Sequence, residues 1–146
     1  PVEHVAKFTA DMARWYREPV LDEDGNVVED GDGRLIAAFA VTTGADKNYE
    51  RGIDGAWMRD GSPYAVLRWA CVERDARRRG VGMFMIDKAL SLARAAGCAT
   101  LRCDIHPAND AMRGLLEKQE FTRCGTVEVR DALGRVKRRA AFEREV

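Results

Sequence analysis

The sequence of 146 residues lacks the features that mark several classes of protein. It has no run of about 18 apolar residues, and its first residues lack the regions of a signal peptide, so we expect neither a membrane span nor a membrane partner. Only 4 prolines interrupt a chain that is 46% hydrophobic and 33% charged, a composition that argues against disorder. We therefore expect a folded cytoplasmic protein.

An excess of basic charge is also missing. Lys and Arg number 24, as do Asp and Glu, giving a formal net charge of +0 at pH 7. Nucleic-acid binding usually requires a basic surface, so we expect no nucleic-acid partner. The charges are unevenly distributed, with acids concentrated in residues 17–32 and basic side chains in residues 130–144. We interpret both stretches as solvated surfaces, the first as a loop or edge hairpin.

The cysteines show no CxxC spacing, which argues against a structural zinc site. Each lies in an apolar stretch, where a reduced cysteine packs as a small hydrophobe; the residues are Cys71, Cys98, Cys103 and Cys124. We expect no metal, no disulfide and no covalent acyl-enzyme on a buried cysteine.

Local patterns predict the order of strands and helices. Residues 34–43 and 64–72 are predicted strands, and the second is apolar on both faces, which is typical of a central strand. A helix follows and stops at Gly97; its expected apolar face consists of Val81, Met83, Ile86, Leu90 and Ala93.

The remaining elements are a strand, a short helix and a hairpin. Residues 99–105 alternate, with Thr100, Arg102 and Asp104 on the polar side. Asn109 is a predicted N-cap of a helix ending near Gln119, and residues 121–130 and 135–144 form the predicted hairpin. Strands joined by a helical crossover are parallel, so we expect an α/β fold with a mixed, mainly antiparallel sheet, a central parallel pair and flanking helices.

A cluster of arginine and glycine lies between the central strand and the first helix: Arg77, Arg78, Arg79, Gly80, Val81 and Gly82. Free N–H groups at a helix start favour an anion, glycine lets it approach closely, and arginine adds charged hydrogen bonds. The cluster predicts a phosphate-bearing ligand, with a plain tight turn as the alternative. No GxxxxGK[ST] motif occurs, so a P-loop nucleotide hydrolase is excluded, and no GxGxxG motif occurs, so the sequence gives little support to a dinucleotide-binding fold.

The same segment resembles the acetyl-CoA signature [QR]xxGxG of the GNAT N-acetyltransferase superfamily, matched by Arg77, Gly80 and Gly82. The stretch NDAMRGLLEKQEF (109–121) is similar to the family's N..A..LYEK.GF block, and the resemblance covers about residues 64–145. CDIHPANDAMRGLLEKQEFTRCG (103–125) is similar to a subgroup with a D-x-H-x-x-N step and Leu in place of the usual Tyr. The family's tyrosine acid would fall at Leu116, and its usual glycine at Glu120.

The resemblance implies one GNAT-like domain over residues 1–146, with its parallel strand pair splayed at the CoA site. The N-terminal strand of such a domain is short or missing here, and an open sheet edge suggests a homodimer. The cofactor-binding residues implied are the strand edge Ala70, Cys71 and Val72 for pantetheine, and the Arg77–Gly82 cluster for pyrophosphate. Asn109 would reach the pantetheine amide, or serve only as a helix cap.

The implied reaction is direct transfer of an acetyl group from acetyl-CoA to a primary amine of a small molecule or peptide. The amine must lose a proton, and the titratable groups nearest the implied cleft are Glu73 and His106. Asp104 shares the strand face of His106, where it is placed to orient the imidazole. Each also has a purely structural interpretation. The alternatives are a non-catalytic CoA-binding or regulatory module on this fold, and a phosphate-dependent protein-interaction domain.

Overall fold

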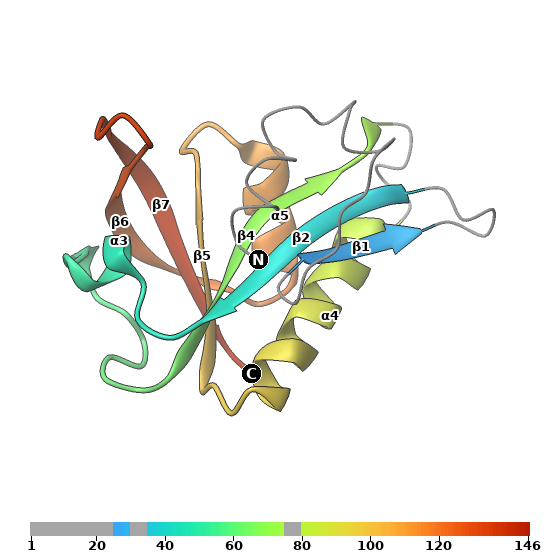
Figure 1. Ribbon diagram of the computed structural model, residues 1–146, viewed down its shortest axis with the longest axis horizontal. Coiled ribbons are helices and arrows are strands. Elements are labelled where there is room, and N and C mark those ends of the chain that lie inside the picture. Colours follow the sequence, from blue (N-terminus) through green and yellow to red (C-terminus); the bar gives the residue numbers. More distant parts are fainter. Residues whose placement is uncertain (1–24, 30–34, 75–79) are drawn as a thin grey trace. The chain divides into compact units, whose positions relative to one another are not determined.

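The computed structural model describes residues 25–29, 35–74 and 80–146 (Figure 1). Arg77, Arg78 and Arg79 therefore lie outside the described residues. So does the N-terminal region, where we predict a short or missing first strand. The chain divides into two compact units, residues 1–42 with 67–92 and residues 43–66 with 93–146, and each is described by itself. The hydrogen-bonded order of the strands, labelled along the chain, is β1 (Gly25–Glu29), β2 (Leu35–Thr43), β4 (Tyr64–Val72), β5 (Thr100–Ile105), β7 (Val136–Glu145), β6 (Thr122–Arg130) and β3 (Asp54–Gly55). The single domain and the homodimer stay predictions.

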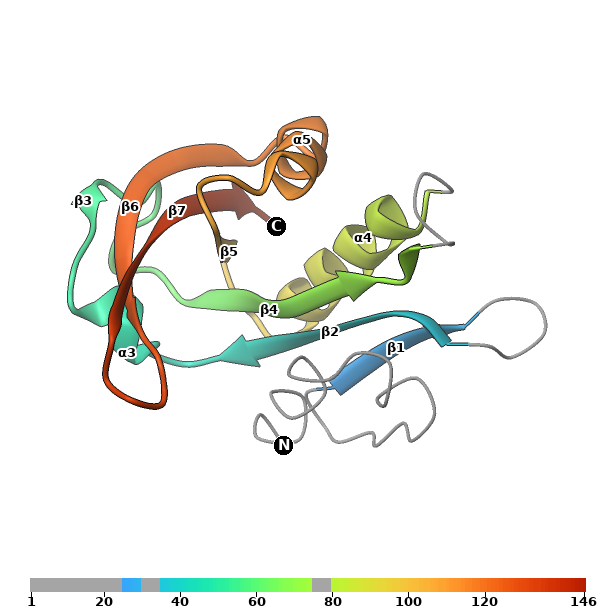
Figure 2. The same ribbon diagram turned by 90° about the horizontal axis from the view of Figure 1, so that it is seen from above.

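The first unit holds β1 (Gly25–Glu29) and most of β2 (Leu35–Thr43), β4 (Tyr64–Val72) and α4 (Val81–Ala95). β1 and β2 are antiparallel and β1 is an outermost strand, which confirms the edge hairpin for the described part of the acidic stretch. α4 covers one face of this part of the sheet (Figure 2). The buried side chains of this unit include Ala37, Phe39 and Ala40 of β2 and Met85 and Ile86 of α4.

The apolar face of α4 is shifted from the predicted one. Met83 is 39% exposed, whereas Met85 is buried together with Ile86, Ala89, Leu90 and Ala93. The prediction for Met83 is therefore wrong. The buried side chains include two adjacent pairs four positions apart, Met85 with Ile86 and Ala89 with Leu90, and Met83 does not lie on this face of the helix. The helix stops where predicted: Gly97 has a φ of 77°, and its N–H donates to the Arg94 carbonyl at 3.0 Å.

The second unit contains α3 (Lys47–Glu50), β3 (Asp54–Gly55), the start of β4, β5 (Thr100–Ile105), α5 (Asp110–Lys118), β6 (Thr122–Arg130) and β7 (Val136–Glu145). β5 runs parallel to β4, with Tyr64–Val66 paired to Thr100–Arg102, while β7 pairs antiparallel with both β5 and β6. The predicted mixed, mainly antiparallel α/β sheet with one central parallel pair is confirmed. α3 and β3 lie beside β6 (Figures 1 and 2).

The segment from residue 44 to residue 63 contributes to the core, which the sequence pattern did not indicate. Asp46 caps α3 by accepting the N–H groups of Asn48 and Tyr49, and this turn buries the Tyr49 ring. The resulting apolar cluster consists of Tyr49, Trp57, Tyr64, Val66, Val127 and Ala141. A polar connection thus supplies two of the cluster's aromatic side chains.

The polar face of β5 is buried rather than solvated. Glu143 of β7 lies opposite Arg102 in the strand pairing, and its Oε1 is 3.0 Å from Arg102 Nε. The Thr100 hydroxyl donates to the same oxygen at 2.7 Å, and the Met58 N–H donates to Oε2 at 2.5 Å. Buried charges are tolerated when they are paired and hydrogen-bonded in this way.

Glu120 occupies a left-handed position at the end of α5. Its φ is 63°, and two closing bonds run from Phe121 N–H to the Leu116 carbonyl at 2.9 Å and from Glu120 N–H to the Glu117 carbonyl at 3.0 Å. This bond pattern is the Schellman motif, which normally takes glycine at the left-handed residue. Glu120 therefore adopts the backbone conformation of the glycine that the family usually has at this position.

Glu120→Gly is expected to raise the free energy of unfolding by about 1 kcal/mol, because glycine adopts this φ without steric cost. Glu117→Gly is the matched control and is expected to lower it by about 1 kcal/mol, because Glu117 lies inside the helix. Urea denaturation measures both. Equal destabilisation by the two variants would contradict the assignment.

Candidate active site

The predicted pantetheine edge follows a strained residue of β4. Trp69 has a φ of 49°, a conformation that bulky side chains rarely adopt and that is often found at functional sites. Ala70, Cys71 and Val72 come next and are half-buried. The Cys71 thiol donates to the Ala38 carbonyl at 3.6 Å, and burial raises its pKa to about 11. Cys71 is therefore protonated at neutral pH and suited to packing rather than to nucleophilic attack.

The predicted site of the pyrophosphate is the start of α4. Gly80 has a φ of 80°, and a Cβ built there would meet no atom of the described chain within 4 Å. At the start of the helix the Phe84 N–H donates to the Gly80 carbonyl at 3.0 Å, and the N–H groups of a first helical turn point toward the helix end. The first turn contains no acidic residue to repel a phosphate. Gly80 therefore has room for a ligand beside it, and binding of a diphosphate by Gly80, Val81 and Gly82 stays a prediction.

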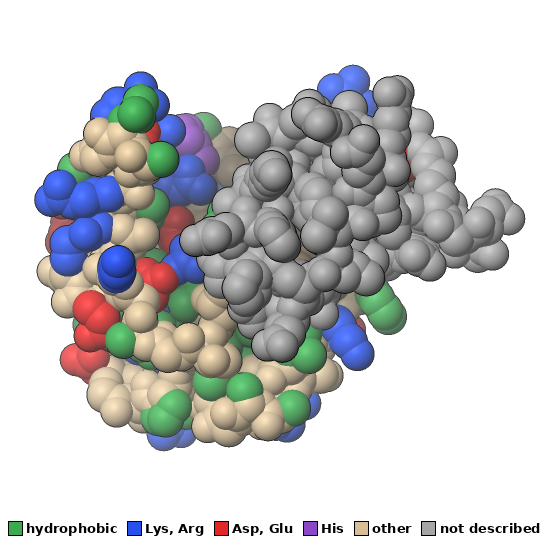
Figure 3. Space-filling model, viewed as in Figure 1, with side chains coloured by type: hydrophobic (Ala, Val, Ile, Leu, Met, Phe, Trp, Pro, Cys, Tyr) green, Lys and Arg blue, Asp and Glu red, His purple; other side chains and the backbone are tan. Residues whose placement is uncertain are grey.

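The two predicted proton acceptors lie in different units. Glu73 follows β4 directly and is half-buried. His106 follows β5 and is exposed, and histidine is visible at the surface in Figure 3. His106 Nδ1 accepts the Ala108 N–H at 3.0 Å, which places the proton of a neutral imidazole on Nε2. To accept a substrate proton, Nδ1 must first release this N–H.

Asp104 has partners other than His106. The Tyr49 hydroxyl donates to Asp104 Oδ1 at 2.6 Å, and Arg139 Nε lies 3.4 Å from Oδ2, an ion pair without hydrogen-bond geometry. Burial, reinforced by the Asp104 charge, raises the pKa of Tyr49 well above its ordinary value. The interpretation of Asp104 as the residue that orients His106 is therefore corrected: it anchors Tyr49.

Asn109 caps α5, as one of its two interpretations predicts. Its Oδ1 accepts the Met112 N–H at 3.1 Å, while the residue itself is exposed. The amide nitrogen of the side chain is not used by this cap. A contact with pantetheine is compatible with the capping role.

Leu116, at the family's tyrosine position, is 0% exposed and belongs to the core. Leu116→Tyr is expected to lower the free energy of unfolding by about 1–3 kcal/mol, because the core has no space for the added ring and hydroxyl. Turnover should not rise. Leu115→Tyr, one position earlier and half-buried, is the control. A Leu116→Tyr protein with unchanged stability and faster turnover would contradict this placement.

Basic side chains gather over the β6–β7 hairpin (Figure 3). Arg135 pairs with Asp131 at 2.8 Å, and Arg138 Nη2 lies 3.5 Å from Asp54 Oδ2. Paired surface charges fit the predicted solvated face over the turn and the start of β7. The prediction is wrong for the end of the stretch, because Ala140, Ala141, Phe142 and Glu143 are buried. The described part of the chain contains no group of three or more side chains suited to a metal ion. None of its helices combines the length and apolar character needed to cross a membrane.

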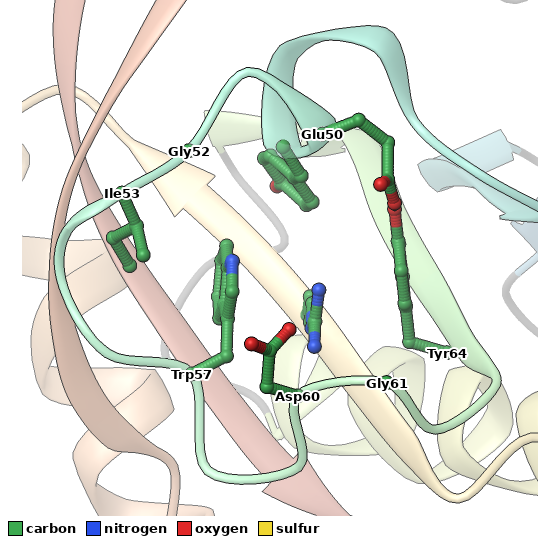
Figure 4. Close-up of a pocket in the computed structure, with 9 residues that line it drawn as sticks. Glu50, Gly52, Ile53, Trp57, Asp60, Gly61 and Tyr64 are labelled. Atoms are coloured by element: carbon green, nitrogen blue, oxygen red, sulfur yellow. The ribbon is translucent and has the colours of Figure 1, made fainter.

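A pocket of about 310 Å³ opens in the second unit, at a place that the sequence did not indicate (Figure 4). Arg102, 3% exposed, is one of its lining residues, with the guanidinium carbon 4.2 Å from the Trp57 ring centre and 3.9 Å from that of Tyr64. Tyr64 receives the Asp46 N–H at 2.8 Å and donates its hydroxyl to Glu50 at 2.9 Å. Burial, then the bond to Glu50, raises the pKa of Tyr64 to about 12, so Tyr64 stays protonated.

Solved structures share this fold. A GNAT-family acetyltransferase from Streptococcus agalactiae has 22% identity and a TM-score of 0.72, over 97% of this chain and 86% of that one. A phosphinothricin acetyltransferase from Sinorhizobium meliloti, solved with AcCoA, has 16% identity and a TM-score of 0.62, over 99% and 69%. A ribosomal-protein-alanine N-acetyltransferase from Brucella melitensis has 18% identity and a TM-score of 0.61, over 100% and 79%.

No curated protein matches this chain in sequence. The family model of the GNAT acetyltransferases, however, matches residues 3–121. The matched range includes β4, the glycine-containing start of α4, β5 and α5. This chain belongs to the GNAT family of acetyltransferases, which are acetyl-CoA-dependent N-acyltransferases.

Proposed function

We propose that this enzyme transfers the acetyl group of acetyl-CoA directly to a primary amine. The observation that carries the proposal is the start of α4, where the family's signature coincides with a left-handed Gly80, beside which the described chain leaves space, and a first helical turn without acidic residues. This arrangement binds a diphosphate through main-chain N–H groups. It is the part of acetyl-CoA recognition that needs the least help from side chains.

The proposed cofactor-binding residues extend from this helix end along the chain. Ala70, Cys71 and Val72 hold the pantetheine arm through main-chain hydrogen bonds, in the manner of an added strand. Gly80, Val81 and Gly82 receive the pyrophosphate, and Arg77, Arg78 and Arg79, outside the described residues, add charged contacts. Asn109 offers its side-chain amide to pantetheine.

The reaction removes two protons from the amine nitrogen. The neutral amine attacks the thioester carbonyl carbon, the C–S bond breaks, CoA leaves as a thiolate, and the proton that the acylated nitrogen then loses passes to this thiolate or to water. An alkylammonium with a pKa near ~10.4 must first lose a proton, which goes to Glu73, to His106 or to water. No tyrosine is needed at Leu116, because a thiol with a pKa near ~8.5 is an adequate leaving group.

His106 has a specific test. If it accepts the amine proton, His106→Ala lowers turnover about 10²-fold and removes the acid limb of the pH–rate profile, with acetyl-CoA binding nearly intact. His106→Asn is the matched variant, because its side-chain oxygen can still accept the Ala108 N–H but cannot act as a base. Full turnover of His106→Asn would mean that His106 serves only to hold the turn, and that Glu73 or water accepts the proton of the amine.

Binding and turnover together test the proposal against a non-catalytic CoA-binding module. Calorimetry with acetyl-CoA measures binding, and a thiol reagent measures CoA release in the presence of a panel of primary amines. We expect binding and amine-dependent thiol release. Binding without release for every amine would favour the regulatory module, and no binding by folded protein would refute both.

A further inference from the structure

The first turn of α4 exposes two large apolar side chains beside the proposed pyrophosphate site. Phe84 is 57% exposed and Met83 is 39% exposed, whereas the other aromatic side chains of the described chain are buried or half-buried. Further along the helix the exposed residues are mostly polar, as at Asp87, Lys88 and Ser91. The large apolar side chains that this helix exposes are therefore concentrated at its start.

Phe84 lies one helical turn after the first glycine of the signature. Its N–H donates to the Gly80 carbonyl at 3.0 Å, a bond that closes one turn of the helix. Side chains of a helix lean toward its N-terminus, so the exposed ring of Phe84 leans toward the turn that contains Gly80 and Gly82. All three residues belong to the first unit.

The nucleotide half of acetyl-CoA offers a partner for such a ring. Only a ribose separates its diphosphate from adenine, which is a flat heteroaromatic base. Bases stack on exposed aromatic side chains without any hydrogen bond to their edges. One helical turn spans about 5.4 Å, so a diphosphate on the amides of Gly80 to Gly82 brings the base within reach of Phe84.

Resting on the proposed function, we propose that Phe84 is the platform on which the adenine of acetyl-CoA stacks. The start of α4 then recognises two parts of the nucleotide, the diphosphate through its main chain and the base through Phe84. The adenine is remote from the thioester within acetyl-CoA. The contact therefore contributes to affinity for the cofactor and not to the chemical step.

Calorimetry with the full chain and CoA measures this contribution. Phe84→Ala should weaken CoA binding by about five- to thirtyfold, within the range for one base stacked on an aromatic side chain. Phe84→Tyr keeps the ring and should keep the affinity. Leu133→Ala is the control, because Leu133 is an apolar side chain that is 77% exposed in the β6–β7 turn, and its loss should not change CoA binding.

Proton NMR of CoA gives a second readout, which a purely structural role of Phe84 would not move. Protons H2 and H8 of an adenine that stacks on an aromatic ring shift upfield. This shift should occur with the wild type and Phe84→Tyr and be absent with Phe84→Ala at saturating protein. Alanine is a strong helix former, so the Phe84→Ala protein should stay folded, as a melting curve verifies.

Unchanged CoA affinity of Phe84→Ala, or an equal loss in Leu133→Ala, would overturn the proposal. An oligomer that light scattering detects for the wild type but not for Phe84→Ala, with CoA affinity unchanged, would assign Phe84 to an interface between copies and also overturn it. No CoA binding by folded wild-type protein would refute this proposal together with the proposed function. CoA binding without acetyl transfer would refute only the proposed reaction, so the two proposals fail separately.

Discussion

Glu143→Leu is expected to lower the free energy of unfolding by about 3–5 kcal/mol, because it leaves the buried Arg102 guanidinium without its carboxylate. Glu143 is 0% exposed and also accepts the Met58 N–H and the Thr100 hydroxyl, which both lose their acceptor. Urea denaturation measures the loss. A loss of this size is a large part of the stability of an ordinary domain.

Two further variants identify the cause of the Glu143 effect. Arg102→Met combined with Glu143→Leu should be more stable than Glu143→Leu alone, because no unpaired charge remains in the core. Glu145→Leu, also on β7, breaks the exposed pair with Arg59 and should cost at most about 1 kcal/mol. If Glu143→Leu cost no more than Glu145→Leu, the buried network would not have the role assigned to it.

Gly82→Asp is expected to abolish most of the stabilisation by acetyl-CoA. At about 100 times its Kd, a ligand that binds only the folded state adds about 2.7 kcal/mol. An aspartate in the first turn of α4 places a side chain and a negative charge against the diphosphate. The same aspartate is favourable for an isolated helix start, so the ligand-free protein should stay folded. Melting temperatures with and without acetyl-CoA measure the loss.

Ser91→Asp is the matched control for Gly82→Asp. It adds the same charge to the exposed face of α4, away from the helix start, and should leave the acetyl-CoA shift intact. Arg78→Ala should reduce the shift by less than Gly82→Asp, because one of several charged contacts is lost. A Gly82→Asp protein with the full shift would remove the start of α4 from the cofactor site.

The elements that the sequence predicted are those with strong local patterns. The continuous apolar run of β4, the stop at Gly97 and the cap at Asn109 each depend on a few neighbouring residues, and all are confirmed. The position of the glycine pair at the start of α4 was predictable for the same reason. A helix face is less certain from sequence, because Met83 and Met85 are equally apolar and only the neighbouring sheet distinguishes them.

The rest of the site depends on contacts between distant parts of the chain. Whether Arg102 faces solvent or Glu143 depends on the register between β5 and β7. The alternation of side chains along β5 does not determine this register. Asp104 accepts the Tyr49 hydroxyl because α3 folds against β6. No periodic pattern in the sequence predicts α3, so this contact could not be predicted. The walls of the pocket come from the same unpatterned segment, with Trp57 and Asp60 near its end.

The most direct measurement of the central claim is the product balance of a single reaction. Purified protein is incubated with acetyl-CoA and a panel of primary amines, and mass spectrometry quantifies N-acetylated amine and free CoA against a reaction without protein. Direct transfer predicts equal amounts of the two products, both dependent on protein and amine. Bound acetyl-CoA with no acetylated amine, or CoA released without a matching acetylated product, would contradict acetyl transfer to a primary amine.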